Sequence, residues 1–261
     1  MLNIVVCIKQ VPDTNEVKLD PVTGRLMREG VPSIINPDDK AALEAALTIK
    51  DAHGAKVSVI SMGPPQADLA LREALAMGAD EAYLVTDRAF GGADTWATSS
   101  TLASAVKKLP YDLILTGRQA IDGDTAQVGP QMAEHLGIPN ISYAQDIQID
   151  GDYVVVQRQY EDRYHVIRAK MPCLVTALSE LNQPRYMTPG GIFDAYREKE
   201  VTIWGRADLD VDDGNIGLKG SPTRVSKSFT KPLKGKGTVV ALDAQESVDF
   251  LVEKLQEKFV L

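Results

Sequence analysis

The chain has 261 residues, of which 44% are hydrophobic and 25% charged, as in an ordinary soluble globular protein. The net charge of −8 is spread along the sequence without long basic runs, which argues against nucleic-acid binding. The first apolar run, at residues 3–8, is too short for a signal peptide or a transmembrane helix, so we expect a cytoplasmic protein with no membrane span.

Buried strands and helices alternate through the first half of the chain. Continuous apolar, β-branched runs predict strands buried on both faces at 3–8, 57–61, 82–85 and 111–115. Helices are expected between them at 36–54, 66–78 and 94–110. The first helix has Asn36 as N-cap, Pro37 in its first turn and Gly54 as its stop. This alternation predicts an α/β fold with a doubly wound, mostly parallel sheet covered by helices on both sides.

Two stretches depart from this alternation. Residues 17–29 alternate in polarity around a Pro–Gly turn and predict an extra hairpin after the first strand. Beyond residue 140 the pattern becomes one of successive strands, expected at 145–149, 153–160, 163–169 and 173–178. We therefore expect an antiparallel meander to close the α/β domain.

The C-terminal part has a different composition. Residues 205–237 are rich in Gly, Asp, Lys and Ser and contain too few apolar residues to build a core, so we expect them to run over a surface, most simply that of a partner. Residues 244–259 have apolar side chains at helical spacing and predict an amphipathic helix. The predicted organisation is a nucleotide- or flavin-binding domain at 1–186 and an extended C-terminal arm at 187–261.

Several kinds of chemistry are poorly supported. Cys7 and Cys173 each lie among apolar residues, which favours two buried thiols over a disulfide. His53, His135 and His165 are scattered without the spacing of a metal site or a catalytic triad. The GxxxxGK[ST] loop of Walker ATPases is absent. We therefore predict no catalytic and no metal-ligating residue.

Four polar loops follow the predicted parallel strands, where open α/β sheets bind ligands: 7–12, 36–39, 62–65 and 117–129. The last leaves a strand and opens a helix, expected at Thr125, so that free N–H groups could bind a phosphate. Asp124 and Thr125 could equally be simple helix caps, and Asp122 and Asp124 are unfavourable beside a phosphate. The length and polarity of this loop favour a binding function.

Six segments match one known family in order and spacing: VVCIKQVPD, INPDDKAALEAAL, SMGPPQ, ALAMGADEAYLV, GRQAIDGDTAQVGPQMAEHLG and MPCLVTALSELNQPRY. They resemble the beta subunit of electron transfer flavoproteins across about residues 3–186. The resemblance implies a fold like that of the adenine nucleotide alpha-hydrolases and a heterodimer with an alpha subunit that carries a second FAD. It also implies a cofactor site formed by Cys7, Asn36, Pro37, Asp38, Met62, Gly117, Gly123, Asp124, Thr125, Ala126, Gln127 and Val128.

Members of this family hold either AMP or FAD in this subunit. The IDGDTAQVGP, KQVPD and VTGRLMREGVPSIINP segments are similar to the electron-bifurcating branch, in which the bound FAD accepts hydride from NADH. The electrons then pass to ferredoxin or flavodoxin and, through the alpha-subunit FAD, to an acyl-CoA dehydrogenase. The protein is thus an electron carrier whose chemistry belongs to the flavin. The non-bifurcating branch with structural AMP is the alternative.

The resemblance also implies a contact with the dehydrogenase. Leu181, in the exposed-looking segment 179–186, corresponds to a leucine that anchors this partner, although a single exposed apolar residue is also common. An alternative of another class is a universal-stress or ATP-pyrophosphatase type of nucleotide-binding domain. Such proteins would not need residues 180–261, and their SGGxDS loop is absent.

Overall fold

The computed structural model describes residues 1–13, 32–226, 235 and 237–260. They belong to two compact units, Met1–Lys227 and Ser228–Leu261, which are described separately below. The hairpin expected at 17–29 lies outside the described residues. No helix in the described part of the chain has both the length and the apolarity that crossing a bilayer would require.

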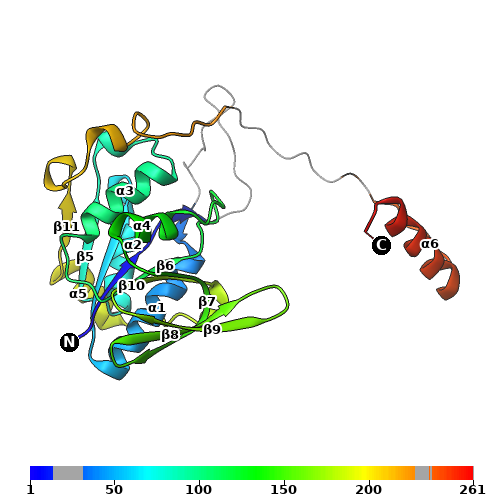
Figure 1. Ribbon diagram of the computed structural model, residues 1–261, viewed down its shortest axis with the longest axis horizontal. Helices are drawn as coiled ribbons and strands as arrows, with labels where there is room; N and C mark the ends of the chain where they lie inside the picture. The colour runs from blue at the N-terminus through cyan, green and yellow to red at the C-terminus, as the bar shows by residue number, and fades with distance from the viewer. Residues whose placement is uncertain (14–31, 227–234, 236, 261) are drawn as a thin grey trace. The chain divides into compact units, whose positions relative to one another are not determined.

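A nine-stranded sheet forms the centre of the first unit, counted over its described residues. Its strands are β1 (Asn3–Cys7), β4 (Lys56–Met62), β5 (Glu81–Val85), β6 (Leu113–Gly117), β7 (Asn140–Asp150), β8 (Tyr153–Gln159), β9 (Tyr164–Lys170), β10 (Cys173–Ala177) and β11 (Val201–Trp204). They lie in the order β11-β5-β4-β1-β6-β10-β7-β8-β9. Figure 1 labels β11 and β5 towards one edge of the sheet and β7, β8 and β9 towards the other. The strands from β11 to β7 are parallel, and β8 and β9 extend one edge in antiparallel fashion. Strands β2 (Gln10–Pro12) and β3 (Ser33–Ile35) form a separate antiparallel pair.

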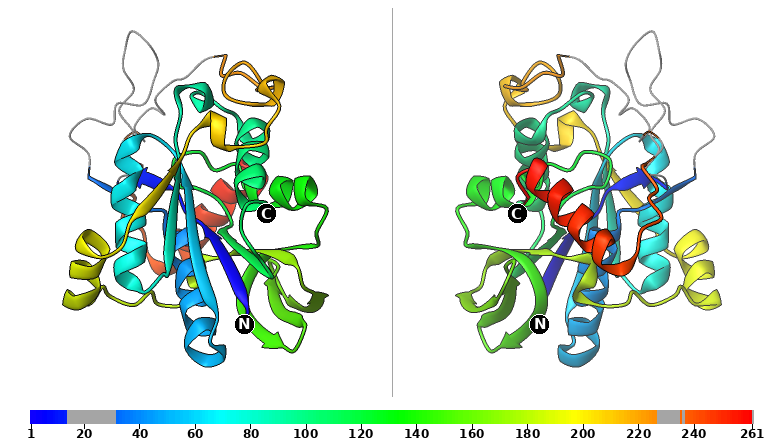
Figure 2. Two further views of the ribbon diagram at one scale, coloured as in Figure 1. Left: turned by 90° about the vertical axis from the view of Figure 1, so that its left-hand side faces the viewer. Right: turned by 90° about the vertical axis from the view of Figure 1, so that its right-hand side faces the viewer.

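Helices cover both faces of the parallel part. They are α1 (Pro37–His53), α2 (Asp68–Met77), α3 (Thr95–Val106), α4 (Val128–Leu136) and α5 (Pro189–Arg197). Side chains of α1, α2 and α5 belong to one buried cluster, and those of α3 and α4 belong to a second cluster across the sheet. Figure 2 shows α1 and α2 on one side and α3 and α4 on the other. The doubly wound α/β fold expected from the sequence is thus confirmed.

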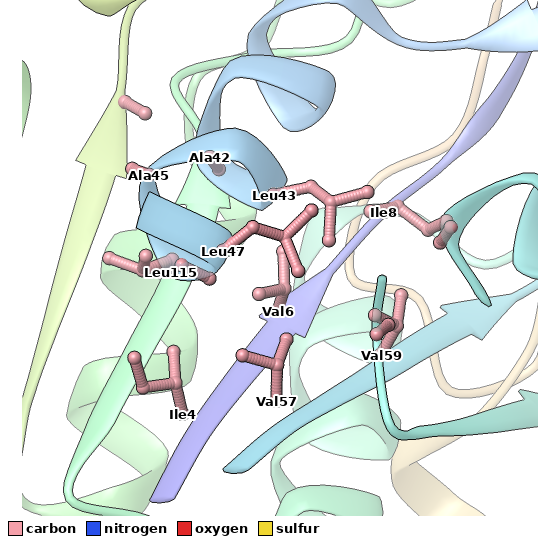
Figure 3. Close-up of a cluster of buried hydrophobic side chains, with 14 of the residues drawn as sticks. Ile4, Val6, Ile8, Ala42, Leu43, Ala45, Leu47, Val57, Val59 and Leu115 are labelled. Atoms are coloured by element: carbon pink, nitrogen blue, oxygen red, sulfur yellow. The ribbon is translucent and has the colours of Figure 1, made fainter. Parts of the chain in front are cut away.

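The alternation of β1 explains how both faces are filled. Because successive strand residues point to opposite faces, Ile4 and Val6 join the cluster under α1, whereas Val5 joins the cluster under α3 and α4. Leu43 and Leu47 of α1, one helical turn apart, pack over this strand (Figure 3). Burying each such side chain contributes about 1.5–3 kcal/mol, so this contact stabilises α1 on the sheet.

The expected antiparallel meander is shorter than predicted. Only β7, β8 and β9 form it, whereas β10 inserts between β6 and β7 and runs parallel to both. All five residues of β10 are buried. A strand buried on both faces lies inside the sheet, between two neighbouring strands and under helices on both sides. The assignment of residues 173–178 to the meander is therefore wrong.

The first unit extends well beyond residue 186, where the sequence predicted its end. Helix α5 packs on α2, and β11 adds a parallel edge strand beside β5, with the rings of Tyr83 and Trp204 stacked at 4.5 Å. Leu209 and Ile216 are buried in the cluster under α3. The segment 205–226 thus packs on this unit itself.

The second unit contains the helix α6 (Ala244–Glu257), close to the helix predicted at 244–259. Its N-terminus is capped by Asp243, which accepts a hydrogen bond from the Glu246 N–H. The apolar side chains Val248, Leu251, Val252 and Leu255 are exposed. The helix therefore has an apolar face that the described residues of its own unit leave exposed.

Candidate functional site

The connections of the sheet identify the edge at which a ligand would bind. From β1 the chain proceeds through α1 to β4 on one side, whereas β6 lies on the other side of β1. Ligands of open α/β sheets bind at the carboxyl ends of strands where the connections diverge in this way. We call this place the switch-point edge. It comprises the carboxyl ends of β1 and β6 and the segments 7–9, 36–39 and 117–128.

Asp39 lies at the centre of the switch-point edge. Its buried carboxylate accepts hydrogen bonds from the Lys9 N–H at 2.8 Å and the Gly117 N–H at 2.9 Å, and so joins the ends of β1 and β6. Burial raises the pKa of Asp39 to about 7, although the hydrogen bonds from Lys9, Asn36 and Gly117 lower it. Asp39 was not among the predicted site residues, because the sequence does not show that an acidic residue in the first turn of a helix is buried and bonds to two distant strands.

Asn36 holds the loop after β6 instead of capping α1. Its side chain makes no capping hydrogen bond. The amide Nδ2 donates to the Gln119 carbonyl at 2.7 Å, and Oδ1 accepts from the Ile121 N–H at 3.0 Å. Asn36 thus occupies the N-cap position of α1 as expected, but its buried amide faces the 117–128 loop and does not cap the helix. Pro37 follows it as the first residue of α1, as predicted.

Asp38, at the same edge, contacts the backbone of Ser179 and the side chain of Arg118. Its Oδ1 accepts from the Ser179 N–H at 3.1 Å, and its Oδ2 lies 3.4 Å from Nε of Arg118. Burial raises the pKa of Asp38, while the Arg118 guanidinium lowers it. Neither Oδ2 of Asp38 nor Nε of Arg118 has a hydrogen-bond partner in the described chain. The two atoms face each other as an ion pair.

The loop between β6 and α4 has an unusual backbone. Asp124 and Ala126 adopt positive φ angles of 49° and 51°, which non-glycine residues seldom do. The helix begins at Val128 and not at Thr125 as expected, so neither Asp124 nor Thr125 caps it. Gln127 occupies the N-cap position without a side-chain cap bond. The N–H groups in the first turn of α4 therefore lack a capping side chain. The positive φ angles of Asp124 and Ala126 strain the backbone, and backbone strain often marks a functional loop.

Two glycines allow backbone to approach closely at this edge. A Cβ at Gly117 would collide with the carboxylate and backbone of Asp39, and one at Gly129 would lie 2.8 Å from both Thr116 Oγ1 and Thr176 Cγ2. Gly129 thus lets α4 start directly against β6 and β10. At Gly123, by contrast, a Cβ would meet nothing within 4 Å, so this side of the loop is open.

The remaining predicted residues lie around these groups. Cys7 is buried at the end of β1, and burial together with the nearby Asp39 raises the pKa of its thiol to about 12. Met62, at the end of β4, packs against the same buried cluster as Cys7. Lys9 forms a 2.6 Å ion pair with Asp122, which places this charged pair across the edge. The edge thus brings together the segments that contain the predicted cofactor residues other than Met62, which lies at the end of β4.

Leu181 differs from the exposed residue that the sequence suggested. It ends a short 3₁₀ helix, Ser179–Leu181, and is half-buried against the main hydrophobic cluster. The following segment is held to α1 by Arg185, whose backbone N–H and guanidinium donate to the buried carboxylate of Glu44. Tyr186 is instead the exposed aromatic residue of this segment, at 95% exposure.

Comparison with known proteins shows which family the chain is similar to. The electron transfer flavoprotein domain model matches residues 23–209. The chain is 61% identical over 257 residues to the electron transfer flavoprotein subunit beta of Clostridium acetobutylicum, which covers 98% of this chain and 99% of that one. Over the full length of both chains it is 57% identical to the caffeyl-CoA reductase-Etf complex subunit CarD of Acetobacterium woodii and 47% identical to the acryloyl-CoA reductase electron transfer subunit gamma of Anaerotignum propionicum.

The chain therefore belongs to the electron transfer flavoprotein family. Within it, these full-length similarities place the chain among the beta subunits, which pair with an alpha subunit. Membership of this family replaces the alternative of a universal-stress or ATP-pyrophosphatase domain. The similarity extends through residues 180–261, the part of the chain that this alternative left without a role.

Proposed function

We propose that this chain binds FAD at the switch-point edge and acts as an electron carrier together with an alpha subunit that holds a second FAD. The observation that carries the proposal is the uncapped start of α4, preceded by the two left-handed residues Asp124 and Ala126. Backbone N–H groups in such an arrangement bind the oxygens of a phosphate or pyrophosphate. The open side of Gly123 leaves room for one.

The residues at the edge fit the remainder of such a cofactor. The pyrophosphate would be held by Gly123–Val128, and the end of β1 at Cys7, the end of β4 at Met62 and the start of α1 would border the rest. Arg118 places a cation at the edge, where it is paired with Asp38. The neutral Cys7 thiol does not serve as a nucleophile, because burial holds its pKa near 12. The chain's residues therefore bind and orient the cofactor.

Bound FAD would supply the redox chemistry, accepting hydride from NADH and passing electrons to ferredoxin or flavodoxin and, through the alpha-subunit FAD, to an acyl-CoA dehydrogenase. Two relatives support an acyl-CoA-directed partner, since their names place them in a caffeyl-CoA reductase complex and in acryloyl-CoA reductase. In this proposal Lys9 and Asp38 set the charge beside the cofactor. The two free, buried thiols of Cys7 and Cys173 fit a reducing compartment such as the cytoplasm.

The second unit supports the heterodimer. The apolar side chains along α6 are exposed, and an amphipathic helix of this kind gains stability by packing on another surface. In this proposal residues 228–261 form the arm that wraps the alpha subunit. The arm is thus shorter than the 187–261 expected from the sequence, because residues 187–226 pack on the first unit.

The cofactor content of the purified complex with the alpha subunit tests the proposal. Denaturation and chromatography should release two FAD per heterodimer. One FAD and one AMP would refute the FAD assignment and support the non-bifurcating alternative. In the same assay, Thr125→Arg should leave one FAD, that of the alpha subunit, because Thr125 is exposed in the loop where the phosphate would approach. An unchanged FAD content would show that the loop does not bind the cofactor.

A further inference from the structure

Strands β1 and β6 are pinned together by an aspartate at each of their two ends. At the amino end, Asp112 accepts hydrogen bonds from the backbone N–H of Asn3 at 2.7 Å and from its side-chain amide at 3.1 Å. At the carboxyl end, Asp39 accepts from the backbone N–H groups of Lys9 and Gly117. Each aspartate thus links the ends of β1 and β6 by hydrogen bonds, but only Asp39 lies at the switch-point edge.

Asp39 reaches this position from α1 and is enclosed on every side. Gly117 has no side chain because the Asp39 carboxylate and backbone occupy that space. The charged and titratable groups around it are Cys7 on β1, the neighbouring Asp38 and, farther out, Lys9. The side chain of Lys9 is directed to Asp122, so its ammonium does not neutralise Asp39 through a direct ion pair.

We propose that Asp39 is a positioning residue for the cofactor: by joining the Lys9 and Gly117 N–H groups, it sets the spacing of the two loops that border the cofactor. This inference rests on the proposed function, since it concerns the same edge. The predicted cofactor residue Cys7 lies just before Lys9, and the loop after Gly117 contains the predicted residues 123–128. No other side chain of the described residues hydrogen-bonds to both of these N–H groups.

The chemistry of the group makes the proposal specific. Two N–H donors require two acceptor oxygens, and a carboxylate has them. An asparagine has the same size but only one side-chain oxygen, so its NH₂ group would face one of the two backbone N–H groups. Two donors that face each other cannot form a hydrogen bond, and the loop that carries this N–H would be displaced. A shift of this kind at a binding loop weakens cofactor binding more than it weakens the fold as a whole, because binding depends on exact placement of the N–H groups.

The test uses the complete chain in complex with its alpha subunit. Asp39→Asn is compared with Asp112→Ala, which removes the matching link at the opposite end of β1 and β6. Asp39→Ala is made in addition, in case the asparagine variant does not assemble. For each complex one measures the Kd of FAD at the beta site, by titrating flavin-depleted protein, and the thermal unfolding midpoint.

We expect substitutions at both positions to lower the unfolding midpoint. Only the Asp39 variants should raise the Kd of FAD, by about tenfold or more, which corresponds to about 1.4 kcal/mol. An unchanged Kd in Asp39→Asn, an equal rise in Asp112→Ala, or loss of the folded complex in both Asp39 variants would overturn the positioning role. A wild-type complex that releases AMP would overturn the FAD proposal alone. The same comparison made with AMP as the probe would then decide the role of Asp39.

Discussion

Replacing Gly129 by alanine tests whether the start of α4 must lie directly against the sheet. The added Cβ would lie 2.8 Å from Thr116 Oγ1 and from Thr176 Cγ2, whereas ordinary contacts begin at 3.4 Å. Because both neighbours are on buried strands, the first turn of α4 has to move outward by about 0.6 Å. The N–H groups proposed to bind the pyrophosphate would move with it.

The expected change in the free energy of unfolding is the difference between two opposing contributions. Overpacking of this kind costs about 1–3 kcal/mol, and the better helix propensity of alanine returns up to about 1 kcal/mol. A net loss of about 1–2 kcal/mol lowers the unfolding midpoint by about 2–8 °C in a unit of this size. Loss of one hydrogen bond to a charged phosphate is worth about 1.5–3 kcal/mol and should weaken FAD binding at least tenfold.

Gly137→Ala provides the control at the other end of the same helix. Gly137 has a φ of 67° with nothing within 4 Å of an added Cβ, so alanine strains the backbone by about 1–2 kcal/mol without displacing the start of α4. The assay is FAD titration of the flavin-depleted complex, with thermal unfolding in parallel. Equal Kd values for Gly129→Ala and Gly137→Ala would refute the argument that the position of this helix start controls binding.

Three further predictions concern interactions of Glu44, Asp94 and Leu181. Glu44→Gln should lower the free energy of unfolding by about 2 kcal/mol, because the Glu44 carboxylate receives hydrogen bonds from the backbone and guanidinium of Arg185; a urea titration showing less than about 0.5 kcal/mol would contradict this. Partial burial acts to raise the pKa of Asp94, but hydrogen bonds, including two from Thr223, bring it below 3.8. The difference in unfolding free energy between wild type and Asp94→Ala should therefore be about 1 kcal/mol near pH 7 and shrink as the pH falls below 3.8; a difference independent of pH would disprove this link. Finally, Leu181→Ala should slow electron transfer to the dehydrogenase at an unchanged FAD content, whereas a loss of stability alone would assign the half-buried Leu181 to the core.

Much of the fold could be predicted because its signals are local. The buried runs at 3–8, 57–61 and 82–85 and the helix beginning at Pro37 lie within a few residues of the observed elements, since strand burial and helix ends depend on neighbouring residues. The loop at 117–129 was identified for the same reason. Its glycines and polar residues directly follow a buried strand.

Other features depended on partners far away in the sequence. Strand β10 reads like any short apolar run, and only pairing with β6 and β7 makes it parallel. Residues 205–226 contain few apolar residues, yet burial of Leu209 and Ile216 attaches them to the first unit. Leu181 appeared exposed because its neighbours are polar, whereas its environment is set by the main hydrophobic cluster.

The sequence by itself determined the alternation of strands and helices, the loops that could bind a nucleotide, and the family resemblance. Only the tertiary structure decided what the polar residues in those loops do. Asn36 and Asp39 read as ordinary residues of a helix start, but Asn36 bonds to the loop at 119–121 and Asp39 bonds to Lys9 and Gly117. A buried polar group must find a partner, and which partner it finds depends on how the strands are ordered in the sheet.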